Sequence, residues 1–106
     1  MATFEDREKE FEAGFKHDEA LRFKVTARRN RLAGLWAAER MGLTGDAAEA
    51  YAKDIATTKF AKGGDNHVIE KLVADLAAKG HAVTSAQVQF ELDHFAARAK
   101  RQIMSE

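Results

Sequence analysis

The chain has 106 residues, in which 17 Lys and Arg balance 17 Asp and Glu, and it contains neither Cys nor Pro. This length suits a single domain, the balanced charge provides no overall attraction to nucleic acid, and the lack of Cys excludes disulfides and thiolate chemistry. There is no apolar run of the roughly 18 residues that a membrane span needs, and no apolar signal core at the start. We therefore expect a cytoplasmic protein without direct membrane insertion, and its abundant Ala, Glu, Lys and Arg favour an all-α fold.

The first 18 residues carry an apolar stripe that is too sparse to form a core of its own. Phe4, Phe11 and Phe15 fall within about 20° of one line on a helix. Gly14 costs about 1 kcal/mol relative to Ala, and an isolated helix this short is marginal in water. We predict a segment that is flexible and partly disordered when free but can become an amphipathic helix. Its stripe either folds back onto its own core or binds in a groove of a partner.

Helix start and stop signals divide residues 19–106 into four predicted helices. Asp46 with Glu49, and Thr84 with Gln87, have the spacing of capping boxes. Thr3 is the predicted N-cap of the N-terminal segment. The first of the four helices is predicted from Glu19 to Met41, followed by Gly42, and the second opens at Asp46. The third is capped by Asp65 and stopped by Gly80, and the fourth follows Thr84.

Each of these four segments repeats apolar residues at steps of three and four, which is the periodicity of an amphipathic helix. The predicted inward stripes are Leu21, Val25, Leu32, Leu35 and Trp36; Ala48, Tyr51, Ala52, Ile55 and Phe60; Val68, Ile69, Leu72, Val73 and Leu76; and Val88, Leu92, Phe95, Ala99 and Ile103. Helices joined by such short links pack as antiparallel neighbours, so the pattern predicts a four-helix bundle.

A basic run lies in the first of these helices, with five Lys or Arg and no acidic residue between positions 20 and 31. One interpretation is a solvated helix face that pairs with the acidic N-terminal segment. Another is a docking patch for an acidic protein surface. A third is a phosphate-binding patch in which Arg28, Arg29 and Arg31, with Trp36 nearby, bind an adenine nucleotide. Nucleic acid is the weaker interpretation, because the total charge is neutral and no aromatic stacking platform accompanies the run.

No pattern in the chain indicates catalysis or a metal site. His17, His67, His81 and His94 are scattered without a metal-ligand spacing. The carboxylates fall on predicted exposed faces, so no pair is set in an apolar pocket. We therefore predict that the protein is not an enzyme and has no catalytic residue, metal or cofactor, apart from the possible nucleotide.

The stretch FEDREKEFEAGFKHDEALRFK, followed by ARRNRLAGLWAAERMGLTGDAAEAYAKDI, resembles the alpha-proteobacterial zeta subunit of F-type ATP synthase, a small helical inhibitor of ATP hydrolysis. The likeness covers nearly the whole chain and is densest from Phe4 to Ile55. It implies a four-helix bundle with an N-terminal inhibitory segment, here Thr3 to His17. In that family the segment is thought to insert at a catalytic interface between alpha and beta subunits, against the gamma subunit of the rotor, and to block rotation in the hydrolytic direction.

The resemblance also implies roles for residues of the N-terminal segment. Its partner-binding residues are the apolar anchors Phe4, Phe11 and Phe15, the leading charges Glu5, Asp6 and Arg7, and His17. The implied partners are the alpha, beta and gamma subunits of ATP synthase, and we expect the free protein to be a monomer. The alternative is that the bundle acts as a sensor for an adenine nucleotide.

Overall fold

The computed structural model describes residues 3–58 and 64–106 of the chain. The described residues form five helices and no strand: α1 (Phe4–His17), α2 (Glu19–Arg40), α3 (Gly45–Thr58), α4 (Gly64–Ala78) and α5 (Ser85–Met104). The all-α prediction is confirmed. The expected count was four helices with a flexible N-terminal segment, and the structure differs because that segment forms a helix, α1. Phe60 lies outside the described residues.

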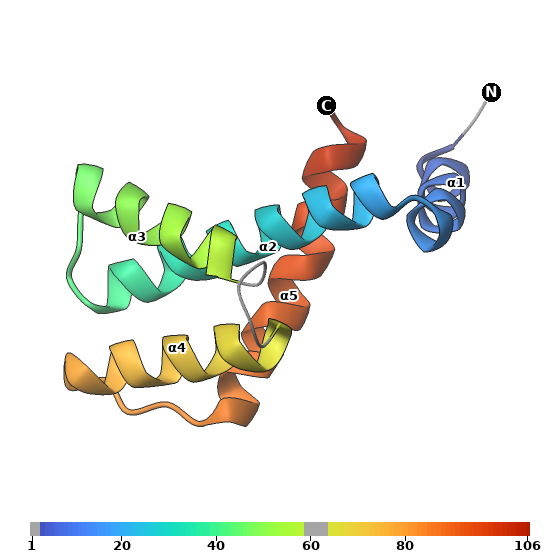
Figure 1. Cartoon of the computed structure of the whole chain (residues 1–106). Coiled ribbons are helices and arrows are strands. Elements are labelled where there is room, and N and C mark those ends of the chain that lie inside the picture. Colours follow the sequence, from blue (N-terminus) through green and yellow to red (C-terminus); the bar gives the residue numbers. More distant parts are fainter. Residues whose placement is uncertain (1–2, 59–63) are drawn as a thin grey trace.

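The central element is α2, the longest helix, against which the others are arranged (Figure 1). The next helix, α3, returns antiparallel along the C-terminal half of α2, while α5 crosses both α2 and α4 (Figure 1). The remaining contacts of α4 are with α2 and α3. At the other end of the molecule, α1 lies against the N-terminal part of α2 and the C-terminal part of α5 (Figure 1). The result is an elongated molecule of 50 × 28 × 23 Å with α1 at one end.

The main core contains side chains from α2, α3, α4 and α5 but none from α1. The predicted stripe of α5 is confirmed in full, because all five of its residues are buried. The stripe of α2 was predicted less well. Its large apolar residues other than Val25 are only partly buried, and the fully buried positions are mostly small: Asn30, Ala33, Gly34, Ala37 and Ala38.

Small residues are buried in α2 because α3 approaches it very closely. A Cβ atom placed on Gly34 would lie 2.8 Å from the Cα of Ala52 and 3.2 Å from the Cβ of Ile55. Real Cβ atoms essentially never come that close to another backbone. The two helices can approach this closely only because Gly34 has no side chain. Large side chains on α2 are therefore displaced to the flanks of the α2–α3 contact.

A partly exposed polar cluster joins α3 to α4. The Tyr51 hydroxyl donates a 2.7 Å hydrogen bond to Asp75, and the Lys71 ammonium lies 3.1 Å from Asp75 and 3.4 Å from Asp54. Burial and the hydrogen bond to Asp75 raise the pKa of the Tyr51 phenol. Burial opposes the charge of Lys71, but the hydrogen bond and attraction of Asp75 outweigh it and raise the pKa of this lysine. Both side chains therefore keep their protons at neutral pH and tie the two helices together.

Several predicted helix ends are confirmed. Thr3 caps α1 and Thr84 caps α5, each through a reciprocal capping box. Gly42 and Gly80, which follow α2 and α4, have positive φ angles of 79° and 82°, a conformation that other residues rarely adopt.

Two predicted helix starts are wrong by two residues. We expected Asp46 and Asp65 to precede their helices, but α3 begins at Gly45 and α4 at Gly64, so both aspartates lie in the first helical turn. There their charge still complements the positive end of the helix dipole. The carboxylate of Glu49, the expected partner of Asp46, instead binds Arg31 of α2.

Candidate functional site on α1

Local signals at both ends define α1. At its start, the Asp6 backbone N–H donates to Thr3 Oγ1 at 3.1 Å, and the Thr3 N–H donates to Asp6 Oδ2 at 3.2 Å. Glu5 and Asp6 lie in the first turn and Lys16 and His17 in the last, which suits the helix dipole. Asp6, expected as a leading charge for a partner, is thus already engaged in capping its own helix.

A single non-helical residue, Asp18, separates α1 from α2. Its backbone is extended, with φ −103° and ψ 104°, and its N–H donates to the Gly14 carbonyl at 2.8 Å. Its carboxylate accepts a 3.1 Å hydrogen bond from the N–H of Leu21. Asp18 therefore ends one helix and caps the next, which makes it a compact hinge.

The predicted stripe of three phenylalanines is divided between two environments. Phe11 and Phe15 are half-buried and stack on each other, with ring centroids 6.4 Å apart and planes 18° from parallel. They pack on a small cluster, separate from the main core, that is built from Val25, Ala99 and Ile103. The structure thus brings two of the three predicted anchors together on the surface of the bundle.

Phe4 does not share this contact, because 55% of its surface is exposed. It lies two helical turns before Phe11, about 10 Å along the axis, where α1 has passed beyond its contact with α2 and α5. Glu5, Arg7 and His17 are exposed as well. The N-terminal half of α1 is therefore an exposed, mostly charged surface with one large apolar side chain.

Lys100 of α5 makes the most specific contact with α1. Its Nζ lies 3.1 Å from Glu12 Oε1 and 4.4 Å from the centroid of the Phe15 ring. One ammonium group thus combines an ion pair with a cation–π contact to the same helix. Sequence analysis missed Lys100, because it is separated from its partners by more than 80 residues and no local pattern marks it.

The three arginines of the basic run in α2 form ion pairs with carboxylates that lie outside α1. Arg28 binds Gln102 and Glu106. The Asp65 carboxylate accepts from Arg29 at 2.9 Å, and that of Glu49 accepts from Arg31 at 2.8 Å. The three arginines thus have three different acidic partners, and the structure does not gather them around one phosphate-sized space.

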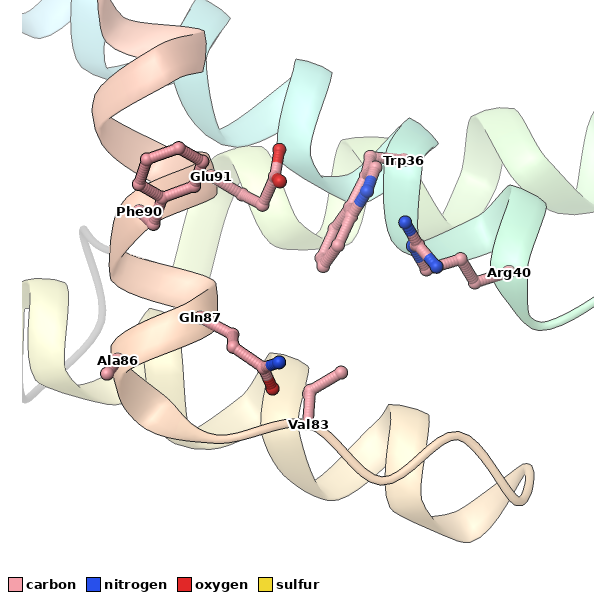
Figure 2. Close-up of a pocket in the computed structure, with 7 residues that line it drawn as sticks. All are labelled: Trp36, Arg40, Val83, Ala86, Gln87, Phe90 and Glu91. Atoms are coloured by element: carbon pink, nitrogen blue, oxygen red, sulfur yellow. The ribbon is translucent and has the colours of Figure 1, made fainter.

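Trp36 lines a recess to which none of the three arginines contributes. This open recess of about 450 Å³ lies between α2 and the start of α5, where the Arg40 guanidinium lies 4.9 Å from the centre of the Trp36 ring system. Figure 2 shows Trp36 and Arg40 facing Gln87 and Glu91 across this recess. The nucleotide hypothesis therefore stays a prediction, without a site that unites its four residues.

Two further features limit the kinds of site that the described residues offer. Within residues 3–58 and 64–106, no group of three or more His, Asp or Glu is arranged to hold a metal ion. None of the five helices is long and apolar enough to cross a membrane. The candidate site is the face of α1 that carries the exposed Phe4 and the half-buried Phe11 and Phe15.

Comparisons with known proteins show the family of the chain. The model of the family described as ATPase inhibitor subunit zeta matches residues 1–102. A protein whose structure was solved by NMR in solution is 39% identical, with a TM-score of 0.69, over 80% of this chain and 96% of that chain. No curated protein matches the chain. The family model spans almost all of the sequence and confirms the resemblance, so the chain belongs to the ATPase inhibitor subunit zeta family.

Proposed function

We propose that this protein inhibits ATP hydrolysis by F-type ATP synthase by inserting the segment Thr3–His17 at a catalytic interface between alpha and beta subunits, against the gamma subunit. The inserted helix blocks rotation in the hydrolytic direction. One observation carries the proposal: α1 is a capped helix, joined by one hinge residue to a main core that contains none of its side chains. An element of that kind can leave the bundle without dismantling it.

The chemistry of α1 suits binding in a groove of a protein partner. An amphipathic helix recognises a groove through a few apolar anchors on one face, with charged residues around them. Complete burial of the exposed Phe4 ring stabilises the bound state by roughly 1.5–3 kcal/mol. Phe11 and Phe15 contribute less each, because their rings are already half-buried in the free protein. Because α1 is already a helix, the entropy lost on insertion is smaller than for a segment that folds only when it binds.

Inhibition by insertion requires no catalytic residue in the inhibitor. The inserted helix acts as a steric obstacle between subunits that must move during hydrolysis. This agrees with a site composed of aromatic rings and exposed charges. The bundle α2–α5 then acts as the carrier that presents the helix.

Phe4 gives the sharpest test, because its ring is exposed in the free protein and its removal leaves the bundle intact. For Phe4→Ala we expect the concentration needed for half-maximal inhibition of ATP hydrolysis to rise about ten- to hundredfold, since one buried ring is lost from the bound state. Phe90→Ala is the matched control, because Phe90 is 71% exposed on α5, outside the inserted segment. Equal potency of Phe4→Ala and the unmodified protein would contradict the role of Phe4 as an anchor.

A further inference from the structure

The face of α1 that carries Phe11 and Phe15 is turned toward its own chain. Both rings are half-buried on the small cluster of Val25, Ala99 and Ile103. A ring cannot pack on this cluster and in the groove of a partner at the same time. We call the packing of α1 on α2 and α5 the docked position, and its place in the groove of the partner the inserted position. The two positions therefore exclude each other.

Lys100 of α5 stabilises the docked position of α1 through contacts with two α1 side chains. Its ammonium lies 3.1 Å from the Glu12 carboxylate and 4.4 Å from the centroid of the Phe15 ring. It therefore contacts both a charged and an aromatic side chain of α1. Lys100 belongs to α5 and lies outside the segment that would be inserted. Its contacts form only when α1 is docked.

The link between α1 and α2 permits the change of position. Asp18 is the one residue between the two helices with extended dihedral angles. A rotation at this residue redirects α1 without unwinding either helix. The half-burial of the rings also makes undocking less costly than removal of a residue from the main core.

We infer that the packing of α1 on α2 and α5 is an autoinhibitory latch, held by Lys100, that must open before the helix can bind its target. This inference rests on the proposed function, because the latch occupies the same rings that act as anchors there. Only the undocked fraction of the protein is competent to inhibit. The apparent dissociation constant for the target is therefore the intrinsic constant divided by the undocked fraction.

The latch predicts a variant that inhibits better than the natural protein. Lys100→Glu removes the ion pair and places two carboxylates face to face, which favours the undocked state. Exposed ion pairs contribute modestly, so we expect half-maximal inhibition at an about two- to fivefold lower concentration. Lys79→Glu is the matched control, since it reverses the same charge beyond the end of α4, far from α1 (Figure 1).

Docking itself can be measured without ATP synthase. Because the chain has no Cys, a single nitroxide label can be attached at Ala97→Cys. Ala97 is exposed on α5 and lines a hollow shared with Glu8 and Glu12 of α1. We expect the label to broaden the backbone amide signals of α1 in NMR spectra of the full chain, whereas a label at Ala78→Cys, at the end of α4, leaves them sharp.

Charge reversal and its rescue complete the test. Lys100→Glu should reduce the broadening of the α1 signals, and the added substitution Glu12→Lys should restore it. An absence of broadening from Ala97→Cys in the full chain would overturn the latch, whether or not the protein inhibits. Broadening that is lost in Lys100→Glu without any gain in inhibition would also overturn it, because the contact would then have no regulatory effect.

Discussion

The two ends of α2 make contacts of opposite kinds. At its C-terminal half, α2 meets α3 through small residues, and the Gly34 backbone lies so close to Ala52 that no side chain fits between them. At its N-terminal end, α2 meets α1 where the half-buried rings of Phe11 and Phe15 pack in one cluster with Val25 and Leu21 of α2.

This difference separates a permanent contact from one that can be released. Close backbone packing leaves no intermediate arrangement, so α2 and α3 either fit together or the core is disrupted. Partly exposed aromatic rings can move from one apolar surface to another. This changes the buried area less than separating α2 from α3 would. The architecture thus has a rigid carrier at one end of α2 and a detachable element at the other.

The largest effect on stability is expected at the rigid contact. In Gly34→Ala, the new Cβ would lie 2.8 Å from the Cα of Ala52, so the helices must separate. We expect the free energy of unfolding to fall by about 1–3 kcal/mol, although Ala is by itself the better helix former. Chemical denaturation monitored by circular dichroism measures this change, and an unchanged midpoint would show that α2 and α3 are not in close backbone contact.

The same substitution at the detachable end is expected to have the opposite sign. A Cβ on Gly14 meets nothing within 4 Å, and Gly14 lies inside α1. Gly14→Ala should therefore stabilise α1 by up to about 1 kcal/mol, because Ala loses less backbone entropy in a helix. Hydrogen exchange of the α1 amides should slow by up to about fivefold. Faster exchange in Gly14→Ala would indicate that α1 needs the conformational freedom of this glycine.

A smaller effect is expected where α2 binds Glu106, which lies two residues after the end of α5. The Arg28 guanidinium, and next to it the Lys24 ammonium, lower the pKa of the Glu106 side chain. A carboxyl with a lowered pKa stabilises the folded state above its ordinary pKa, and this stabilisation is lost as the pH falls through the lowered value. In Arg28→Gln, the pKa of Glu106 should move back toward its ordinary value in an NMR titration.

The matched control for this titration is Arg31→Gln, because Arg31 pairs with Glu49 and should leave Glu106 unaffected. The stability difference between Arg28→Gln and the natural chain should also shrink on acidification and in high salt, since the pair is exposed. A difference that persists at low pH would assign the role of Arg28 to its bond with Gln102 instead.

Features with local causes could be predicted from the sequence. The capping box of α5 depends on two residues three positions apart, and the N-cap Thr3 and the stops at Gly42 and Gly80 depend on one residue each. The stripe of α5 was found because a helix that is packed along its whole length repeats its apolar residues regularly.

Features with distant causes could not be predicted. The burial of small residues in α2 follows from the approach of α3 to Gly34, which no periodicity reveals. The pairing of Lys100 with Glu12 joins opposite ends of the chain. The split of the phenylalanine stripe depends on where the contact of α1 with the bundle ends, so Phe4 and Phe11 look alike in the sequence but differ in the structure.

The central claim is that inhibition is carried by α1 and not by the bundle. The most direct measurement is ATP hydrolysis by the cognate F-type ATP synthase, titrated with the full chain and with a chain lacking residues 1–18. Circular dichroism should first show that the shortened chain is folded, as expected because the main core has no residue from α1. We expect inhibition by the full chain and none by the shortened one. Equal inhibition by both would contradict the central claim and place the inhibitory contact within α2–α5.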